Sequence, residues 1–219
     1  ARAGSFLIAF SQLAVNYLND GMVNDAEDVL IRFKGKDPEL SYYLGYIQDK
    51  KGNKTEAEKY FKDANSQSED YCFPFRLETI TVLEKALQYN PKDGKANYYI
   101  GNILYDKQPG KAIASWENAI KNEPALAIAY RNLGWGYNRH AHDVKKAIPF
   151  YEKAISLNKT DAVYYDELDI LYETNNSPID VRLKLFEGNN EIVRNRDDAF
   201  VRQIGVLTLA GKPEKSVEY

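Results

Sequence analysis

Residues 130–154, YRNLGWGYNRHAHDVKKAIPFYEKA, contain the pattern that decides the fold. Gly134 follows a leucine, Ala147 comes 13 residues later, and Tyr151 comes four residues after that. The apolar residues before and after the polar RHAHD segment keep the three- and four-residue spacing of one helix face. The stretch therefore predicts two antiparallel helices joined by a turn, with Gly134 and Ala147 as the small residues at a close helix crossing.

The same order of residues occurs twice more, around Gly45 and Gly101. In each copy an aromatic residue follows the small residue, and we expect its ring to fill the wedge between successive helix pairs. Breakers such as Gly52 and Pro109 mark the turn inside a pair. The matching positions are Leu44-Gly45, Ala57, Phe61 and Ala64 in one copy, and Ile100-Gly101, Ala112, Trp116, Ala119 and Pro124 in the other.

This pattern resembles the tetratricopeptide repeat family. The resemblance implies an all-α fold, a right-handed superhelical solenoid of antiparallel helix pairs. Three outer copies are weaker. Ala14 stands in the glycine position of an N-terminal copy. Asp169 stands there in a degenerate copy whose alanine position holds Val181, and Gly205 opens a last copy whose second helix is expected to begin at Pro213.

The register of the repeats is interrupted between Gly45 and Gly101. These glycines are 56 residues apart, too far for one repeat of about 34 residues and too close for two. We expect a loop over residues 66–74 in place of a first helix. The predicted division is therefore 1–68 as N-terminal repeats, 69–93 as an irregular loop with a single helix, and 94–219 as C-terminal repeats, the last one truncated.

A narrower likeness involves residues 71–78, YCFPFRLE, together with NPKD at 90–93 and YYIGN at 98–102. This run is similar to the C-terminal repeats of uncharacterised bacterial proteins in which a galactose-mutarotase-like β-sandwich comes first. The resemblance implies a carbohydrate-related parent protein, of which this chain would be one piece. Because that sandwich lies outside this sequence, no activity is transferred from it.

Composition argues against several classes of partner. With 29 basic and 32 acidic residues the net charge is -3, which gives no broad positive field for nucleic acid or an anionic membrane. No apolar run reaches the roughly 18 residues that a membrane span requires. We therefore expect no nucleic-acid binding and no membrane insertion, and a cytoplasmic location.

The residues capable of chemistry are few. Cys72 is the only cysteine, and we expect it to be a half-buried apolar thiol beside Tyr71 and Phe73. His140 and His142 fall in a polar turn, which favours a solvated role over a metal site. The carboxylates of Asp166, Glu167 and Asp169 diverge on a helix and have no identifiable second partner, so we interpret them as a solvated or lightly paired face.

Phosphate-binding glycine loops and nucleophile elbows do not occur in the sequence. Together with the weak histidine and carboxylate candidates, this predicts a protein that is not an enzyme and uses no metal or cofactor.

The 17 tyrosines are the more informative feature. In repeats of this kind the first helix of each pair lines the concave groove, and counting from each glycine predicts an aromatic groove with amide and guanidinium donors. Arg131 and Arg139 would bind a carboxylate with paired hydrogen bonds. The predicted groove residues are Tyr42, Tyr46, Tyr98, Asn102, Tyr105, Arg131, Trp135, Asn138 and Arg139.

Aromatic rings stack on prolines, apolar side chains and the C–H faces of sugars. The first interpretation is a scaffold that holds a protein or peptide segment, or another domain of its own parent chain, in the groove. The alternative is an accessory module of a carbohydrate-processing protein that contributes to sugar recognition.

Overall fold

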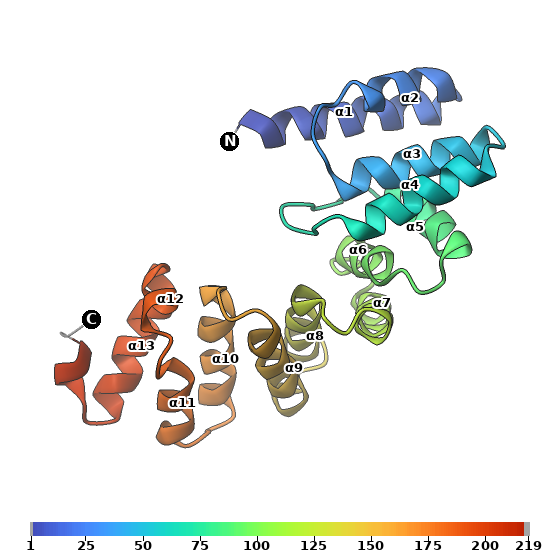
Figure 1. The fold of residues 1–219 in the computed structure, drawn as a ribbon. Coiled ribbons are helices and arrows are strands. Elements are labelled where there is room, and N and C mark those ends of the chain that lie inside the picture. Colours follow the sequence, from blue (N-terminus) through green and yellow to red (C-terminus); the bar gives the residue numbers. More distant parts are fainter. Residues whose placement is uncertain (1, 217–219) are drawn as a thin grey trace. The chain divides into compact units, whose positions relative to one another are not determined.

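The chain is all-helical. A computed structural model describes the backbone of residues 2–216 and the side chains of residues 8–215, and no β-strand occurs in that part of the chain (Figure 1). Its contacts divide it into two compact units, Ala1–Glu123 and Pro124–Tyr219. The all-α class and the paired helices predicted from the sequence are confirmed.

Unit 1 contains three helix pairs and one single helix. The pairs are α1 and α2, α3 and α4, and α6 and α7, and the single helix α5 packs against α3 and α6. The bounds are α1 Arg2–Asn19, α2 Val23–Ile31, α3 Pro38–Lys50, α4 Lys54–Ser66, α5 Glu78–Tyr89, α6 Gly94–Leu104 and α7 Pro109–Asn122. Residues 67–77, between α4 and α5, form no helix.

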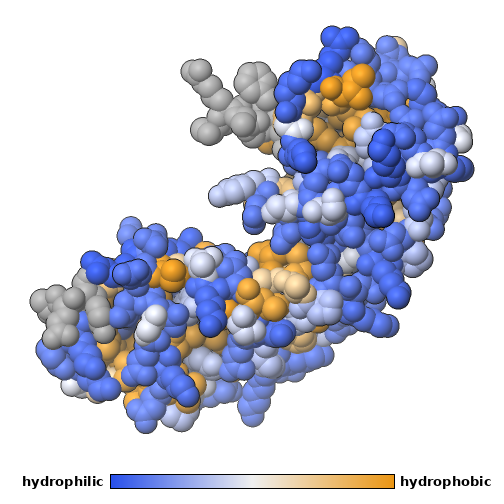
Figure 2. Space-filling view, in the orientation of Figure 1, coloured by the Kyte–Doolittle hydropathy of each residue, from blue (hydrophilic) through white to orange (hydrophobic). Residues whose placement is uncertain are grey.

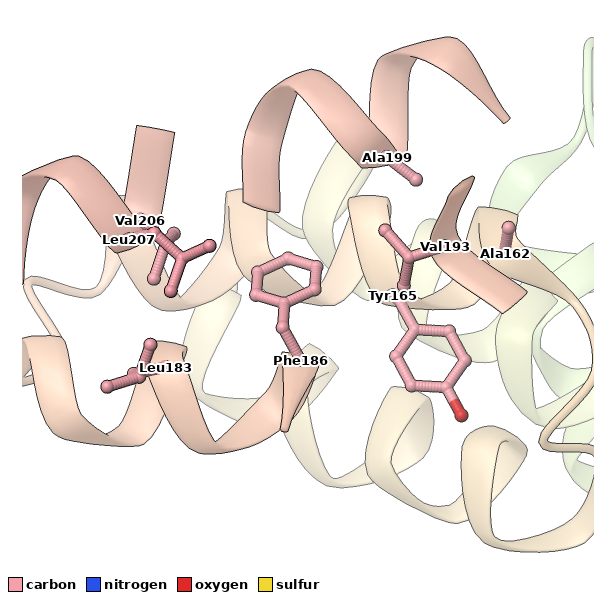
Figure 3. Packing of buried hydrophobic residues seen from close by; sticks show 8 residues of the cluster. All are labelled: Ala162, Tyr165, Leu183, Phe186, Val193, Ala199, Val206 and Leu207. Atoms are coloured by element: carbon pink, nitrogen blue, oxygen red, sulfur yellow. The ribbon is translucent and has the colours of Figure 1, made fainter. Parts of the chain in front are cut away.

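Unit 2 contains two helix pairs, which are followed by two further helices and a 3-10 turn. Its core joins α10, α11, α12 and α13 around the rings of Tyr165 and Phe186 (Figure 3). The bounds are α8 Ala127–Arg139, α9 Val144–Leu157, α10 Ala162–Thr174, α11 Ile179–Phe186, α12 Asn190–Arg194, α13 Asp197–Leu209 and the 3-10 turn η1 Pro213–Ser216. The helix predicted from Pro213 onward is this short turn, and its continuation lies outside the described residues.

Local chemistry fixes where the helices begin. The side chain of Asp37 accepts a hydrogen bond from the backbone of Leu40 at 3.2 Å, and Asp93 accepts one from Ala96 at 2.8 Å. Asp161 caps α10 in the same way. Such N-caps satisfy backbone donors that the first turn leaves unpaired, so the first helix of each of these pairs has a defined start.

The turns inside four of the five helix pairs share one backbone conformation, and the turn between α6 and α7 is the exception. Gly21, Gly52, His142 and Asn176 all have a positive φ, which reverses the chain after the first helix of each of these four pairs. Glycine adopts this conformation without strain, and asparagine and histidine are among the residues that tolerate it. His142 is therefore a turn residue, as its place in the polar segment predicts.

The close crossings depend on the aromatic residues. A Cβ atom built on Gly45 would lie 2.6 Å from Cδ1 of Phe61, and one built on Gly134 would lie 2.5 Å from Cε2 of Tyr151. Gly101 stands in the same way against the indole of Trp116. The predicted need for glycine is confirmed. The aromatic ring was expected to fill the wedge between successive pairs, but it packs on the glycine of its own pair, so its main contact is within the pair.

The degenerate copy replaces this packing by an ion pair. Asp169 is fully buried, and both of its oxygens accept hydrogen bonds from Arg182 at 2.8 Å. The placement of Val181 in the alanine position was wrong by one residue, because Val181 is 40% exposed and Arg182 faces Asp169. A salt bridge thus joins α10 to α11, whereas glycine and an aromatic ring join α3 to α4, α6 to α7 and α8 to α9.

Candidate functional site

The predicted groove residues belong to the first helices of pairs in both units, and each half is described by itself. In unit 1 they lie on α3 and α6, except Tyr105, which directly follows α6, and in unit 2 all of them lie on α8. The unit 1 residues are Tyr42, Tyr46, Tyr98, Asn102 and Tyr105, and the unit 2 residues are Arg131, Trp135, Asn138 and Arg139.

Two of the predicted groove residues are instead part of the core of unit 1. Tyr42 is 0% exposed, and its hydroxyl donates to the carboxylate of Asp93, with both oxygens at 3.0 Å. Tyr98 is 4% exposed and packs against Tyr99, with ring centroids 5.1 Å apart. These two assignments were wrong, because a residue without exposed surface cannot contact a ligand.

The reason for the burial of Tyr42 is the cap of α6. Asp93 accepts the backbone N–H of Ala96 and is itself buried, so burial raises the pKa of its carboxyl group while these hydrogen bonds oppose the rise. A buried carboxylate needs further donors. Tyr42 supplies one, and its ring also meets the edge of Tyr99 at 6.2 Å.

The remaining unit 1 residues are half-buried. Tyr46 lies beneath the Lys50 ammonium, 4.9 Å from its ring centroid. Asn102 accepts a hydrogen bond from the Trp116 indole at 3.0 Å, and Tyr105 packs against the same indole at a centroid distance of 5.3 Å. Asn102 and Tyr105 therefore support Trp116, and part of each side chain still reaches the surface.

Arg131 already has a partner within the chain. Its Nε donates to Oε2 of Glu167 at 2.7 Å, and its Nη2 donates to Oε1 of the same carboxylate, which joins α8 to α10. The prediction that Arg131 offers an unpaired charge to a ligand was wrong. The reason is that α10, the first helix of the following pair, places the acidic Glu167 beside Arg131.

Trp135 and Arg139 form the accessible part of the unit 2 half. The half-buried Trp135 ring has the Arg131 guanidinium carbon 5.0 Å from its centroid and that of Arg139 at 4.7 Å. Arg139 is exposed and forms no salt bridge with any residue of the described chain. Asn138, beside them on α8, is half-buried.

This cluster carries one uncompensated positive charge. Glu167 neutralises Arg131, whereas the charge of Arg139 has no such partner, and Tyr151 lies near both arginines. Burial raises the pKa of the Tyr151 hydroxyl, and the neighbouring Glu167 raises it further, so the hydroxyl is neutral at physiological pH. The cluster combines an aromatic face, a neutral hydroxyl and one available guanidinium. Such a set suits an anionic group attached to an apolar one.

The carboxylates of α10 are each held by an arginine. Arg202 of α13 donates to Asp166 at 2.9 Å, while Asp169 is held by Arg182 and also contacts Arg202 at 3.3 Å. Burial raises the pKa of Asp166, and the Arg202 guanidinium opposes that rise. These groups are committed to structural ion pairs, and their pairing is more extensive than the solvated face predicted from the sequence.

The sequence contained a signal for this network. Arg131, Asp166 and Arg202 occupy the same position, three residues before Gly134, Asp169 and Gly205, on successive first helices. Charges that alternate in sign at one repeat position lie next to each other when the repeats stack. Comparing equivalent positions between repeats would have predicted the contact of Arg202 with Asp166. Arg131 instead bonds to Glu167, one residue beyond the equivalent position.

The other candidate residues have plain structural roles. The Cys72 thiol, predicted to be half-buried, is buried at 1% exposure, and burial raises its pKa to about 12, while its neighbours Tyr71 and Phe73 are exposed. His140 is exposed. In residues 8–215 no three His, Cys, Asp or Glu side chains are grouped so that they could hold a metal ion. No helix in the described part of the chain has the length and apolar character needed to cross a bilayer.

Comparison with known proteins agrees with this architecture. Residues 38–71, which contain α3, α4 and the start of the following loop, match the tetratricopeptide repeat family model. Tetratricopeptide repeat protein 21B of Mus musculus is 24% identical over 147 residues, which cover 65% of this chain and 10% of that protein. The chain thus spans about a tenth of the length of this relative.

Two solved structures resemble the fold. The crystal structure of MamA superposes with a TM-score of 0.52 and 21% identity, covering 80% of this chain and 90% of MamA. PilF of Pseudomonas aeruginosa superposes with a TM-score of 0.51 and 14% identity, covering 100% of this chain and 90% of PilF. The fold is therefore that of tetratricopeptide-repeat solenoids.

Proposed function

We infer that the chain is a non-catalytic interaction scaffold that binds an acidic peptide segment on the first helices of its repeats. The observation that carries this proposal is the cluster on α8, where Trp135 lies beside two guanidinium groups and only one of them forms a salt bridge among the described residues. The segment could come from another protein or from another domain of the same parent chain.

The binding role divides between the two accessible residues. Trp135 offers an aromatic face for an apolar side chain, because its ring is only half-buried and large rings dominate contact energies at interfaces. Arg139 offers a fixed positive charge for a carboxylate, because its guanidinium stays ionised at physiological pH. Arg131 positions the Trp135 ring and is held in turn by Glu167.

A neutral sugar would use these residues less well. It could stack on Trp135 and hydrogen bond to Asn138, but it would leave the Arg139 charge without a counter-ion. The charge therefore favours a peptide over the carbohydrate-related alternative.

Side-by-side selection on a peptide array and a glycan array tests the proposal. We expect the purified chain to retain acidic peptides and to release them as salt rises, because the exposed Arg139 contact is screened by ions. Retention of neutral glycans with no acidic peptide retained would contradict the proposal and favour the carbohydrate-related module.

A further inference from the structure

The loop between α4 and α5 presents a row of apolar side chains to solvent. Tyr71 is 89% exposed, Phe73 71%, Phe75 60% and Leu77 64%. These four residues, termed the apolar ridge below, alternate with residues that point inward. The loop extends beyond the C-terminal end of α4 (Figure 1).

The ridge is held in place by the residues between its members. Cys72 is 1% exposed and lies near Tyr99 and Asp37, and Pro74 is also buried. The backbone N–H of Cys72 donates to the carbonyl oxygen of Glu69 at 3.2 Å. Because Cys72 and Pro74 are buried, they anchor the loop between the exposed side chains of Tyr71, Phe73 and Phe75.

Tyr71 adds a sign of strain. Its φ is 61°, a left-handed conformation that a bulky residue rarely adopts. Such a conformation costs on the order of 1 kcal/mol or more and persists where the surroundings impose it, often at functional sites. Here it accompanies a tyrosine that is almost fully exposed.

The ridge differs from the rest of the described surface. On the face drawn in Figure 2 hydrophilic residues predominate, and hydrophobic ones are visible in a few separate areas. Among residues 8–215, no other stretch of seven residues carries more than two exposed large hydrophobic side chains. Isolated exposed apolar residues are ordinary, whereas a concentration of four is typical of an interaction site.

We propose that the apolar ridge docks a short amphipathic segment of another protein that carries Lys or Arg beside its apolar residues. The charged residues around the ridge determine which charge a docking segment must carry. Residues 68–78 contain three acidic residues, Glu69, Asp70 and Glu78, and one basic residue, Arg76, which lies 3.3 Å from Glu78. Lys95 of α6 lies 3.3 Å from Glu69, so three negative and two positive charges leave the border with a net negative charge. An acidic border around an apolar row complements a basic border around an apolar face.

The size of the ridge favours a short segment. If each fully exposed side chain offers roughly 200 Å², the ridge presents on the order of 500 Å² of apolar surface. A stable protein dimer buries about 800 Å² from each partner. A second copy of this chain would also bring two acidic borders together, and an anionic membrane would be repelled by them.

This site is separate from the cluster on α8 and takes a ligand of the opposite charge, so the two proposals fail independently. The probe is a phage-displayed library of random peptides, selected in parallel on the wild-type chain and on the double variant Phe73→Ser with Phe75→Ser. The control is Val201→Ser with Leu209→Ser, which removes two similarly exposed apolar side chains, 67% and 68% exposed, from α13. Circular dichroism and thermal melting establish that each variant is folded.

We expect selection to enrich peptides that combine apolar residues with Lys or Arg. Their affinity should fall by roughly tenfold or more in the ridge variant, change less than about twofold in the α13 control, and be unaffected by Trp135→Ala. Three outcomes would overturn the proposal. These are equal enrichment on the ridge variant, enrichment of acidic peptides that depend on the ridge, and ridge-dependent binding to phosphatidylcholine vesicles without peptide binding.

Discussion

Arg182 holds Asp169 through two parallel hydrogen bonds of 2.8 Å, at the place where three other helix pairs pack glycine against an aromatic ring. Asp169 is 0% exposed and Arg182 is 8% exposed, so the pair is removed from water. The two helices of these pairs are therefore held together either by close packing on glycine or by an ion pair. The Asp169–Arg182 pair also lies beside Arg202, which joins α13 to α10.

Breaking this ion pair should destabilise unit 2. Arg182→Ala leaves the carboxylate of Asp169 buried with only the Arg202 contact at 3.3 Å, and loss of one partner of a buried pair costs roughly 3–5 kcal/mol. Urea unfolding followed by circular dichroism measures the loss. The double variant Asp169→Gly with Arg182→Ala, which restores the small residues of the other copies, should be more stable than Arg182→Ala alone. A double variant that is less stable would show that the ion pair is more than a substitute for small-residue packing.

Two glycines at equivalent repeat positions should respond oppositely to alanine. A Cβ atom at Gly134 would lie 2.5 Å from Tyr151 and 3.2 Å from the carbonyl oxygen of Ala147, so Gly134→Ala should cost roughly 1–3 kcal/mol. A Cβ atom at Gly205 meets nothing within 4 Å in the described chain, and alanine favours helix by about 0.5–1 kcal/mol. Gly205→Ala should therefore raise the melting temperature, and equal effects of the two variants would contradict the assigned crossing.

Unit 1 should lose stability as the pH rises through neutrality. Burial, with the nearby Asp37 carboxylate, raises the pKa of Glu39 from 4.5 to about 7, against hydrogen bonding from Thr79. Because the folded pKa exceeds the unfolded one, the stabilisation is complete below about pH 4.5 and is lost as the pH passes 7. The effect is at most about 3 kcal/mol. Denaturant unfolding between pH 5 and pH 8 should show this decline, and Glu39→Gln should flatten it; a decline of the same size in Glu39→Gln would assign it to other groups.

Replacing each of the two arginines beside Trp135 by alanine should affect different properties, stability for one and peptide binding for the other. Arg131→Ala should lower stability, because Glu167 is 14% exposed in its side chain and would lose its partner. Arg139→Ala should leave the melting temperature unchanged, since the exposed guanidinium forms no salt bridge in the described chain, but should weaken an acidic peptide. Thermal melting and fluorescence anisotropy on the same two variants separate these effects. A stable Arg131→Ala with unaltered peptide binding would contradict the assignment.

The fold could be predicted from the sequence because the close crossings need particular residues. Gly45, Gly101 and Gly134 each accommodate an aromatic ring, and that requirement is visible as a spacing. Arg182 was missed because an arginine in the alanine position is not part of that pattern. Its role becomes apparent only when the buried Asp169 is known to need a partner.

The candidate site was less predictable, because it depends on contacts between repeats. Tyr42 was assigned to a groove from its helix position alone. The interrupted repeat contributes a single helix, α5, instead of a pair, and the Tyr42 hydroxyl bonds to Asp93, the cap residue of α6. Arg131 was assigned to a ligand, but Glu167 on the next first helix binds it. Helical spacing does not report these contacts, which join residues 36 to 51 positions apart.

The most direct test of the scaffold function is the affinity of an array-selected acidic peptide for the wild-type chain and for Trp135→Ala, measured by isothermal titration calorimetry. Ile170→Ala is the control, because Ile170 is an apolar residue of α10 that is 37% exposed. The scaffold function predicts that Trp135→Ala weakens binding roughly tenfold or more with the fold intact, while Ile170→Ala changes it less than about twofold. The same Kd for Trp135→Ala and for the wild-type chain would contradict it.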